Sequence, residues 1–294
     1  MAEPDSSAIF TFGGGAWLHA FYFGVGTALA EYSRDRGDPS VRFCGVSSGS
    51  LVASALAYQL DVHEMFEVAL STFPLSARNP FKAVGCTWDC IRRNTPHVED
   101  IQRVSHQRRL LIGVSKHQSW CKLQPVNIHQ FRDNEYAVAV TSASCCLPVL
   151  GGLRGVLIDG ERYFDGQLTQ NWSRLPVFDD VQESDCIVRV TAYHNPDFEA
   201  LRSGWITPRI QLPQVWTLMP HSIEALRLLW RLGYLRTIEY LLYSQDALRL
   251  RKHFHEPSPE TCQSLATDLQ RVMCALEPMM QERLRCGRPR SRQQ

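Results

Sequence analysis

The chain lacks a strong charge of either sign. Its 31 lysines and arginines nearly balance 30 aspartates and glutamates, which leaves a formal net charge of +1 at pH 7. A clustered basic excess is the usual electrostatic footprint of nucleic-acid-binding proteins, so we expect no nucleic acid as a partner. With 294 residues, 44% of them hydrophobic, the composition is that of an ordinary globular protein.

The sequence also lacks the cysteine patterns of disulfide scaffolds and zinc sites. Ten cysteines are scattered along the chain, and no pair has the C-x-x-C spacing. Cys86, Cys90 and His97 come nearest to a metal-binding spacing, but we do not interpret them as a zinc site. The start of the chain, MAEPDSSAIF, lacks the basic residues of a signal peptide. We expect reduced thiols, a cytoplasmic protein, and neither a metal nor a cofactor.

One apolar run, residues 8–30, is long enough to suggest a membrane span. Three consecutive glycines at 13–15 and a histidine interrupt it, and no basic flank marks one side. We interpret it as a buried strand at 8–12, a glycine loop, and a buried helix at 16–32. Such a loop aims backbone N–H groups at an anion. The Walker lysine and the G-x-G-x-x-G pattern are both absent, which leaves an oxyanion hole or a plain tight turn.

A G-x-S-x-G box, Gly45-Val46-Ser47-Ser48-Gly49, lies between a β-rich run and a small-residue helix at 51–60. Ser47 has glycines on both sides at the spacing that a sharp strand-to-helix turn requires, because backbone passes close to the serine there. Such a turn exposes the hydroxyl as a nucleophile. The alternative is a serine that simply caps the helix, and the box alone leaves both interpretations open.

The glycine loop and the serine box occur in an order that resembles the patatin-like lipid acyl hydrolases, within which the adipose triglyceride lipase branch is most similar. The resembling segments are FGGGAWLHAFYFGVGTAL at 12–29, GVSSGSL at 45–51, ASCCLPVL at 143–150, GERYFDGQLTQN at 160–171 and, more weakly, GYLRTIEYL at 233–241. The resemblance implies a lipid acyl-ester hydrolase, an acylglycerol lipase or phospholipase, that works at a membrane or lipid-droplet surface. It also implies a serine–aspartate dyad without a catalytic histidine.

The dyad aspartate of that family is followed by glycine, and two aspartates fit. Asp159-Gly160 joins two β-rich runs, which is the strongest short signal for a two-residue hairpin, so we predict that Asp159 is a turn residue. Asp165 ends the second run, and Asn171 follows at the family's spacing. We predict Ser47 as the nucleophile and Asp165 as the base, with the Asp165 pKa raised by burial.

The resemblance assigns the oxyanion hole to the backbone N–H groups of Gly14, Gly15 and Ala16. Ala16 and His19 replace glycines that are usual in the family, and Gln167 replaces a small residue. A positive φ at Ala16 would strain its Cβ, whereas His19 is expected to face solvent. These departures keep a catalytically weak or inactive lipid-binding relative open as an alternative.

A further alternative is a small-ester hydrolase with a Ser-His-Asp triad. Four histidines follow Asp165 and are formal candidates: His194, His221, His253 and His255. None lies in a recognisable loop signature, so we predict that none is required.

The order of expected elements predicts an α/β fold, a three-layer α/β/α patatin-like domain with a mostly parallel central sheet and a C-terminal helical appendage. We expect an acyl hydrolase domain at 8–200, a helical extension at 215–280 and a basic disordered tail at 285–294. Further strands are expected at 41–46, 109–115, 123–128, 136–141, 155–165 and 186–193.

Residues 220–254 form an amphipathic pattern with leucines on one side and arginines on the other. The apolar side either closes the core of the domain or, with its basic neighbours, meets an anionic lipid surface. Residues 256–264 are expected to be a linker or turn. The sequence leaves the oligomeric state open.

Overall fold

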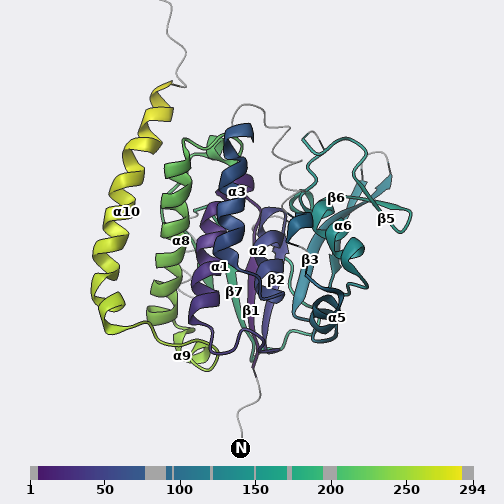
Figure 1. Cartoon of the computed structure of the whole chain (residues 1–294), viewed down its shortest axis with the longest axis horizontal. Coiled ribbons are helices and arrows are strands. Elements are labelled where there is room, and N and C mark those ends of the chain that lie inside the picture. Colours follow the sequence, from purple (N-terminus) through teal and green to yellow (C-terminus); the bar gives the residue numbers. More distant parts are fainter. Residues whose placement is uncertain are drawn as a thin grey trace, which may run out of the picture.

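The computed structural model describes residues 6–76, 91–94, 96–119, 122–148, 150–170, 174–194 and 204–286 (Figure 1). Its centre is one mixed sheet in the order β5-β6-β3-β2-β1-β7-β8, with β4 paired to β3. The strands are β1 (Ala8–Phe12), β2 (Val41–Val46), β3 (Leu110–Ser119), β4 (Lys122–Ile128), β5 (Val156–Ile158), β6 (Glu161–Asp165), β7 (Cys186–Val190) and β8 (Trp205–Ile206).

The middle of the sheet is parallel. β1 pairs in parallel with β2 and β7, β2 with the start of β3, and β7 with β8, whereas β4, β5 and β6 add antiparallel pairs at one side. β1 and β2 are buried along their whole length, as expected for strands covered on both faces. The α/β class with a mostly parallel sheet is therefore confirmed.

The helices lie mainly against one face of this sheet. They are α1 (His19–Tyr32), α2 (Ser48–Ala57), α3 (Val62–Ser76), α5 (Val98–His106), α6 (Asn134–Ser144), α8 (Ile223–Tyr243), α9 (Ala247–Leu250) and α10 (Pro259–Cys286), with short 3-10 helices η1 (Ala16–Leu18), η2 (Gly166–Leu168) and η3 (Gln214–Thr217).

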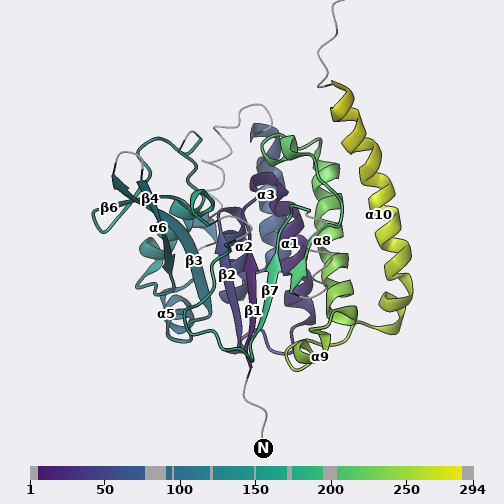
Figure 2. The ribbon, with the colours of Figure 1, turned by 180° about the vertical axis from the view of Figure 1, so that it is seen from behind.

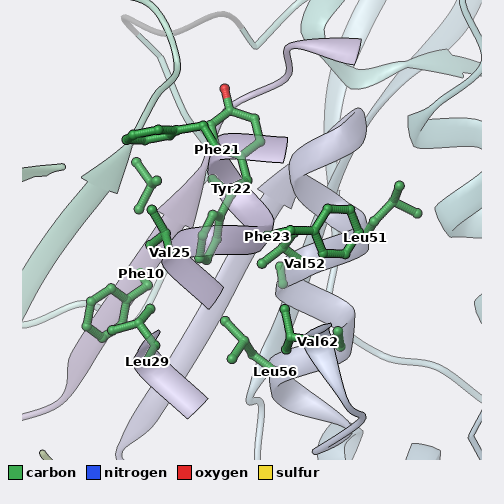
Figure 3. Packing of buried hydrophobic residues seen from close by; sticks show 14 of the residues in the cluster. Phe10, Phe21, Tyr22, Phe23, Val25, Leu29, Leu51, Val52, Leu56 and Val62 are labelled. Atoms are coloured by element: carbon green, nitrogen blue, oxygen red, sulfur yellow. The ribbon is translucent and has the colours of Figure 1, made fainter. Parts of the chain in front are cut away.

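The main core lies between the helices and this face. Phe10 from β1 packs with Phe23 from α1 and with Leu56 from α2 in one buried cluster (Figure 3). On the opposite face, seen in Figure 2, Phe178 from an irregular segment covers a smaller cluster with Cys44 and its neighbours on the strands. Both faces of the central strands are therefore shielded from solvent.

Helix α8 belongs to this core. A Cβ on Gly24 of α1 would lie 1.8 Å from the carbonyl oxygen of Trp230, and a Cβ on Gly233 of α8 would lie 2.0 Å from that of Phe21. The two glycines thus let the helix backbones touch. Between its exposed ends, Ile223 and Tyr243, α8 buries a row of leucines and Ile238. The interpretation that this segment closes the core is therefore confirmed, and the buried row does not face lipid. The boundary between a catalytic domain and a helical extension stays a prediction.

Two expectations for local structure were wrong. The strand expected at 136–141 is absent, because these residues lie in helix α6. Asp133 caps this helix by accepting from the N–H of Tyr136 at 2.7 Å. The linker expected at 256–264 ends early, since α10 begins at Pro259 and Ser258 accepts from the N–H of Thr261. Of the predicted tail, residues 287–294 lie outside the described residues.

Candidate active site

The serine box forms a strained turn between β2 and α2. Ser47 has φ 51° and ψ −135°, a backbone conformation that is rare for residues other than glycine. A Cβ on Gly45 would lie 2.6 Å from the carbonyl oxygen of Gly49, and a Cβ on Gly49 would lie 2.3 Å from that of Gly13. Both glycines are therefore required by close backbone approach, as the spacing predicted.

Two other serines hold this turn. The N–H of Ser47 donates to Oγ of Ser144 at 2.9 Å, and Ser144 Oγ donates to the carbonyl of Gly113 at 2.7 Å. Ser50 Oγ donates to the carbonyl of Ser47 at 2.6 Å. These bonds tie the strained residue to α6, β3 and α2, so the surrounding structure fixes its conformation.

Asp165 meets Ser47 from the end of β6. Ser47 Oγ donates to Oδ2 of Asp165 at 2.7 Å, and the N–H of Gln167 donates to Oδ1 at 2.8 Å. The main chain of Asp165 is held on both sides, because its N–H donates to Cys146 and its carbonyl accepts from Ser115. The two predicted residues, 118 positions apart in the chain, are thus joined by a short hydrogen bond.

Burial sets the acidity of this carboxyl group. Asp165 is 1% exposed, and burial raises its pKa from 3.8 to about 7, against the opposing effect of the hydrogen bonds from Ser47 and Gln167. A carboxyl group with a pKa near 7 is about half ionised at pH 7, and its ionised form is basic enough to take a proton from a hydroxyl. The geometry and the acidity therefore suit proton abstraction from Ser47.

The second aspartate is placed elsewhere. Ile158 pairs with Glu161, which leaves Asp159 and Gly160 as a two-residue turn with φ 50° and 79°. Asp159 is exposed and forms an ion pair with Arg132 at 2.7 Å. The prediction that Asp159 is a turn residue is confirmed.

The glycine loop is anchored by a buried tyrosine, and one of its backbone N–H groups already donates to a side chain. Tyr22 OH donates to the carbonyl of Gly14 at 3.0 Å, and the N–H of Gly15 donates to Ser48 Oγ at 3.0 Å. Ala16 has φ 44°, so the Cβ on this residue sits in the strained region that glycine tolerates. Of the three expected oxyanion donors, Gly15 thus has a side-chain partner in this structure.

Gln167 fills space beside the loop. The point where a Cβ on Gly14 would stand lies 1.7 Å from the carboxamide oxygen of Gln167 and 2.8 Å from Cβ of Ser47. The side chain of Gln167 is half-buried there. A small residue at this position would leave that space open.

His19 and His253 lie in environments other than that of Ser47. His19 does not simply face solvent, because its ring packs between Trp17 and Phe23 with centroids 5.3 Å apart in each pair. Burial lowers the pKa of His19 to about 4, which a hydrogen bond with the Ala16 backbone opposes, so the ring is neutral at pH 7. His253 pairs with Asp38 at 2.8 Å. The partner of the Ser47 hydroxyl is Asp165.

Among the described residues, no group of three His, Cys, Asp or Glu side chains could hold a metal ion. Cys86, Cys90 and Asn171 lie outside the described residues. Sequence reasoning missed Ser48, Ser144 and Tyr22. A tyrosine inside the otherwise apolar helix at 16–32 was a usable signal for Tyr22, because a buried hydroxyl requires a partner.

Comparison with known proteins finds one similar protein among the curated ones. No family model matches the chain. The chain is 26% identical over 166 residues to the human protein named patatin-like phospholipase domain-containing protein 4, a match that covers 55% of this chain and 64% of that protein. The chain is thus similar to that protein over part of its sequence, and the match spans less than two thirds of that protein's length.

Two solved structures are similar at low identity. VipD from Legionella pneumophila has 13% identity and a TM-score of 0.40, with 94% of this chain and 67% of that chain covered. ExoU, in its complex with SpcU from the type III secretion system of Pseudomonas aeruginosa, has the same identity and TM-score, with 93% and 59% covered.

The acidity of Asp165 generates a pH-dependent expectation. Since the base must be ionised, kcat/KM for an ester should rise with pH and level off above the pKa of Asp165, about 7. The variant Asp165→Asn should lose at least about 10²-fold in kcat, as for a missing general base. Initial rates from pH 5 to 9 with a soluble ester measure both.

The free energy of unfolding should change with pH in the opposite direction to kcat/KM. Because the pKa of Asp165 is about 7 when folded against an ordinary 3.8, the folded chain binds the proton more tightly, and the free energy of unfolding falls as pH rises from 4 to 7. Asp165→Asn escapes that loss, which is on the order of 4 kcal/mol at most, so it should unfold at a higher temperature than wild type at pH 8. Asp159→Asn is the matched control and should retain both activity and stability, because Asn-Gly suits the same turn. An active Asp165→Asn would rule out the base assignment.

Proposed function

We propose that this relative of the patatin-like phospholipases is a lipid acyl-ester hydrolase that uses Ser47 as nucleophile and Asp165 as general base. The observation that carries the proposal is the 2.7 Å hydrogen bond from Ser47 Oγ to Asp165 Oδ2, formed in a buried site where the pKa of the carboxyl is about 7. A nucleophile hydrogen-bonded to a base whose pKa is close to the working pH is the expected arrangement for covalent acyl transfer.

In the first half-reaction, Ser47 Oγ attacks the ester carbonyl and its proton passes to Oδ2 of Asp165. The tetrahedral oxyanion is stabilised by hydrogen-bond donors at the glycine loop, for which Gly14, Gly15 and Ala16 are the backbone candidates. Collapse of the intermediate releases the alcohol, which takes the proton from Asp165. Water then attacks the acyl-enzyme with Asp165 again as base, and Ser47 is regenerated.

The substrate we propose is an ester at a lipid surface. The 3-10 helix η3 packs against η1, which directly follows the glycine loop, and exposed apolar side chains gather there: Val215, Leu218, Met219 and Ile223. We call these four residues the apolar rim. An exposed apolar cluster beside a site marks contact with lipid or protein, and insertion would bring the ester to Ser47.

Within this reading, the enzyme is an acylglycerol lipase or phospholipase of the adipose triglyceride lipase branch, cytoplasmic and peripherally bound to a membrane or lipid droplet. No helix among the described residues has the length and hydropathy to span a bilayer. The arginines of α8 do not form an open basic face, since Arg227 pairs with Glu67 and Arg236 with Glu239. We therefore assign membrane attachment to the apolar rim, which includes the first residue of α8, and not to the arginine-bearing side of that helix.

Two observations favour a weak or inactive lipid-binding relative as the second candidate. The Gln167 side chain occupies space between Gly14 and Ser47, and Ala16 is strained at φ 44°. A triad hydrolase has less support, because the Ser47 hydroxyl donates to a carboxylate.

The nucleophile is tested by labelling with a fluorophosphonate probe. Wild type should take up one probe on Ser47, identified by mass spectrometry of the digested protein, and Ser47→Ala should take up none, since only the activated hydroxyl reacts. An adduct on Ser50, or no adduct on a folded sample, would contradict the assignment of Ser47 as the nucleophile.

The apolar rim is tested by charge insertion. The double variant Leu218→Asp with Met219→Asp should weaken binding to phosphatidylcholine vesicles at least about tenfold, because two apolar side chains no longer insert. Hydrolysis of a soluble short-chain ester should stay unchanged. Leu248→Asp is the control, since Leu248 is 73% exposed on α9, at the other end of α8 (Figure 1). Equal vesicle binding by both variants would remove the rim from the proposal.

The second candidate function is tested at Gln167. If the carboxamide blocks the site in most molecules, Gln167→Ala should raise the rate of Ser47 labelling by about tenfold, because a larger fraction is competent. Leu168→Ala, a neighbour on η2, should leave the rate unchanged. If the Gln167→Ala variant is slower than wild type, Gln167 assists the reaction and does not obstruct it.

A further inference from the structure

Ser48 directly follows the nucleophile and is itself buried, with 5% of its surface exposed. Its Oγ accepts the N–H of Gly15 at 3.0 Å. The Ser48 hydroxyl therefore occupies the Gly15 N–H, which would otherwise be available to a substrate oxyanion. Nothing in the G-x-S-x-G pattern requires a hydroxyl at this position.

The peptide between Gly14 and Gly15 cannot readily turn away from Ser48. Its carbonyl, on Gly14, accepts from Tyr22 OH at 3.0 Å, and Tyr22 OH in turn accepts the N–H of Ala192 at 3.1 Å. Tyr22 is fully buried. Because the C=O and N–H of one planar peptide point in opposite directions, the bond to Tyr22 keeps the Gly15 N–H on Ser48.

The hydroxyl protons around the site can be traced. Ser47 donates to Asp165, Ser50 donates to the Ser47 carbonyl, and Ser144 donates to the Gly113 carbonyl. A serine hydroxyl has one proton and two lone pairs, and Ser48 uses a lone pair for Gly15. In the part of the chain that the structure describes, no protein acceptor takes the Ser48 proton. A buried donor beside the nucleophile thus remains unused.

We propose that the Ser48 hydroxyl is a catalytic residue that donates a hydrogen bond to the oxyanion, a role that rests on the proposed function. As Ser47 Oγ bonds to the carbonyl carbon, the C=O electron pair moves to oxygen, and Ser48 O–H stabilises the charge while the Ser47 proton goes to Asp165. The Gly15 N–H acts through Ser48, because donation into its oxygen polarises the O–H. Collapse restores the carbonyl, and the Ser48 proton stays on Ser48 throughout.

The test is the hydroxyl series at position 48, assayed with a soluble ester. Ser48→Ala should lower kcat by about 10²-fold with KM within about threefold, because the bond forms only in the transition state. Ser48→Thr keeps the hydroxyl and should stay within about tenfold of wild type. Ser54→Ala removes a buried hydroxyl further along α2 and should behave as wild type. Thermal unfolding and the fluorophosphonate labelling rate accompany each variant.

The outcomes separate the two proposals. An active wild type with an equally active or faster Ser48→Ala overturns the role of Ser48, because the Gly15 N–H would then serve directly. If Ser48→Ala and Ser48→Thr lose activity equally while both unfold at the wild-type temperature, the hydroxyl is not what matters and the role is again overturned. A folded wild type that neither hydrolyses esters nor takes up the probe overturns the proposed function, and with it this role.

Discussion

The hydrogen bond between Ser47 and Asp165 is the constraint on which the rest of the site depends. A carboxylate that is 1% exposed resists ionisation, and in this chain two hydrogen bonds only partly offset that cost. The site therefore lowers stability at neutral pH in exchange for a base of useful strength. The same burial that raises the pKa of Asp165 also removes water that would compete for the Ser47 hydroxyl.

A short bond between residues from β2 and β6 demands a rigid frame. β2 and β6 both lie beside β3, and β3 anchors each partner: Gly113 holds Ser144 under Ser47, and Ser115 holds the Asp165 carbonyl. The strain at Ser47 is tolerable because these contacts fix its neighbours. Sites on strand ends are positioned more precisely than sites on loops, which suits the proposed nucleophile and base, 2.7 Å apart.

The sequence allowed us to predict the residues whose backbone geometry is constrained locally. It did not reveal the residues that support the site through long-range hydrogen bonds. The glycines at 45 and 49 and the Asp159-Gly160 hairpin follow from local rules. Together with the family resemblance, they allowed Ser47 and Asp165 to be predicted as partners from the sequence alone. Ser144 bonds to Ser47 across 97 positions, and Tyr22 to Ala192 across 170. A tyrosine in an apolar helix signals a buried hydroxyl that needs a partner, but no local pattern identifies that partner. Helix α6 was missed because the tyrosine, valines and threonine of residues 136–141 also suit a strand, whereas the cap at Asp133 favours a helix.

The departures from the family pattern acquire a common physical meaning in the structure. At the glycine loop, Ala16 and Gln167 each place a side chain where the family has a smaller residue, and Ser48, from the serine box, adds a hydroxyl against the Gly15 N–H. An oxyanion can be stabilised by hydroxyl or carboxamide groups as well as by backbone N–H groups, so such replacements change which atoms donate without necessarily removing the hole. Side-chain donors are more mobile than a clamped peptide, however, and Tyr22 restrains only the peptide. Loop order around Ser48 and Gln167 then becomes the property that separates an efficient hydrolase from a lipid-binding relative.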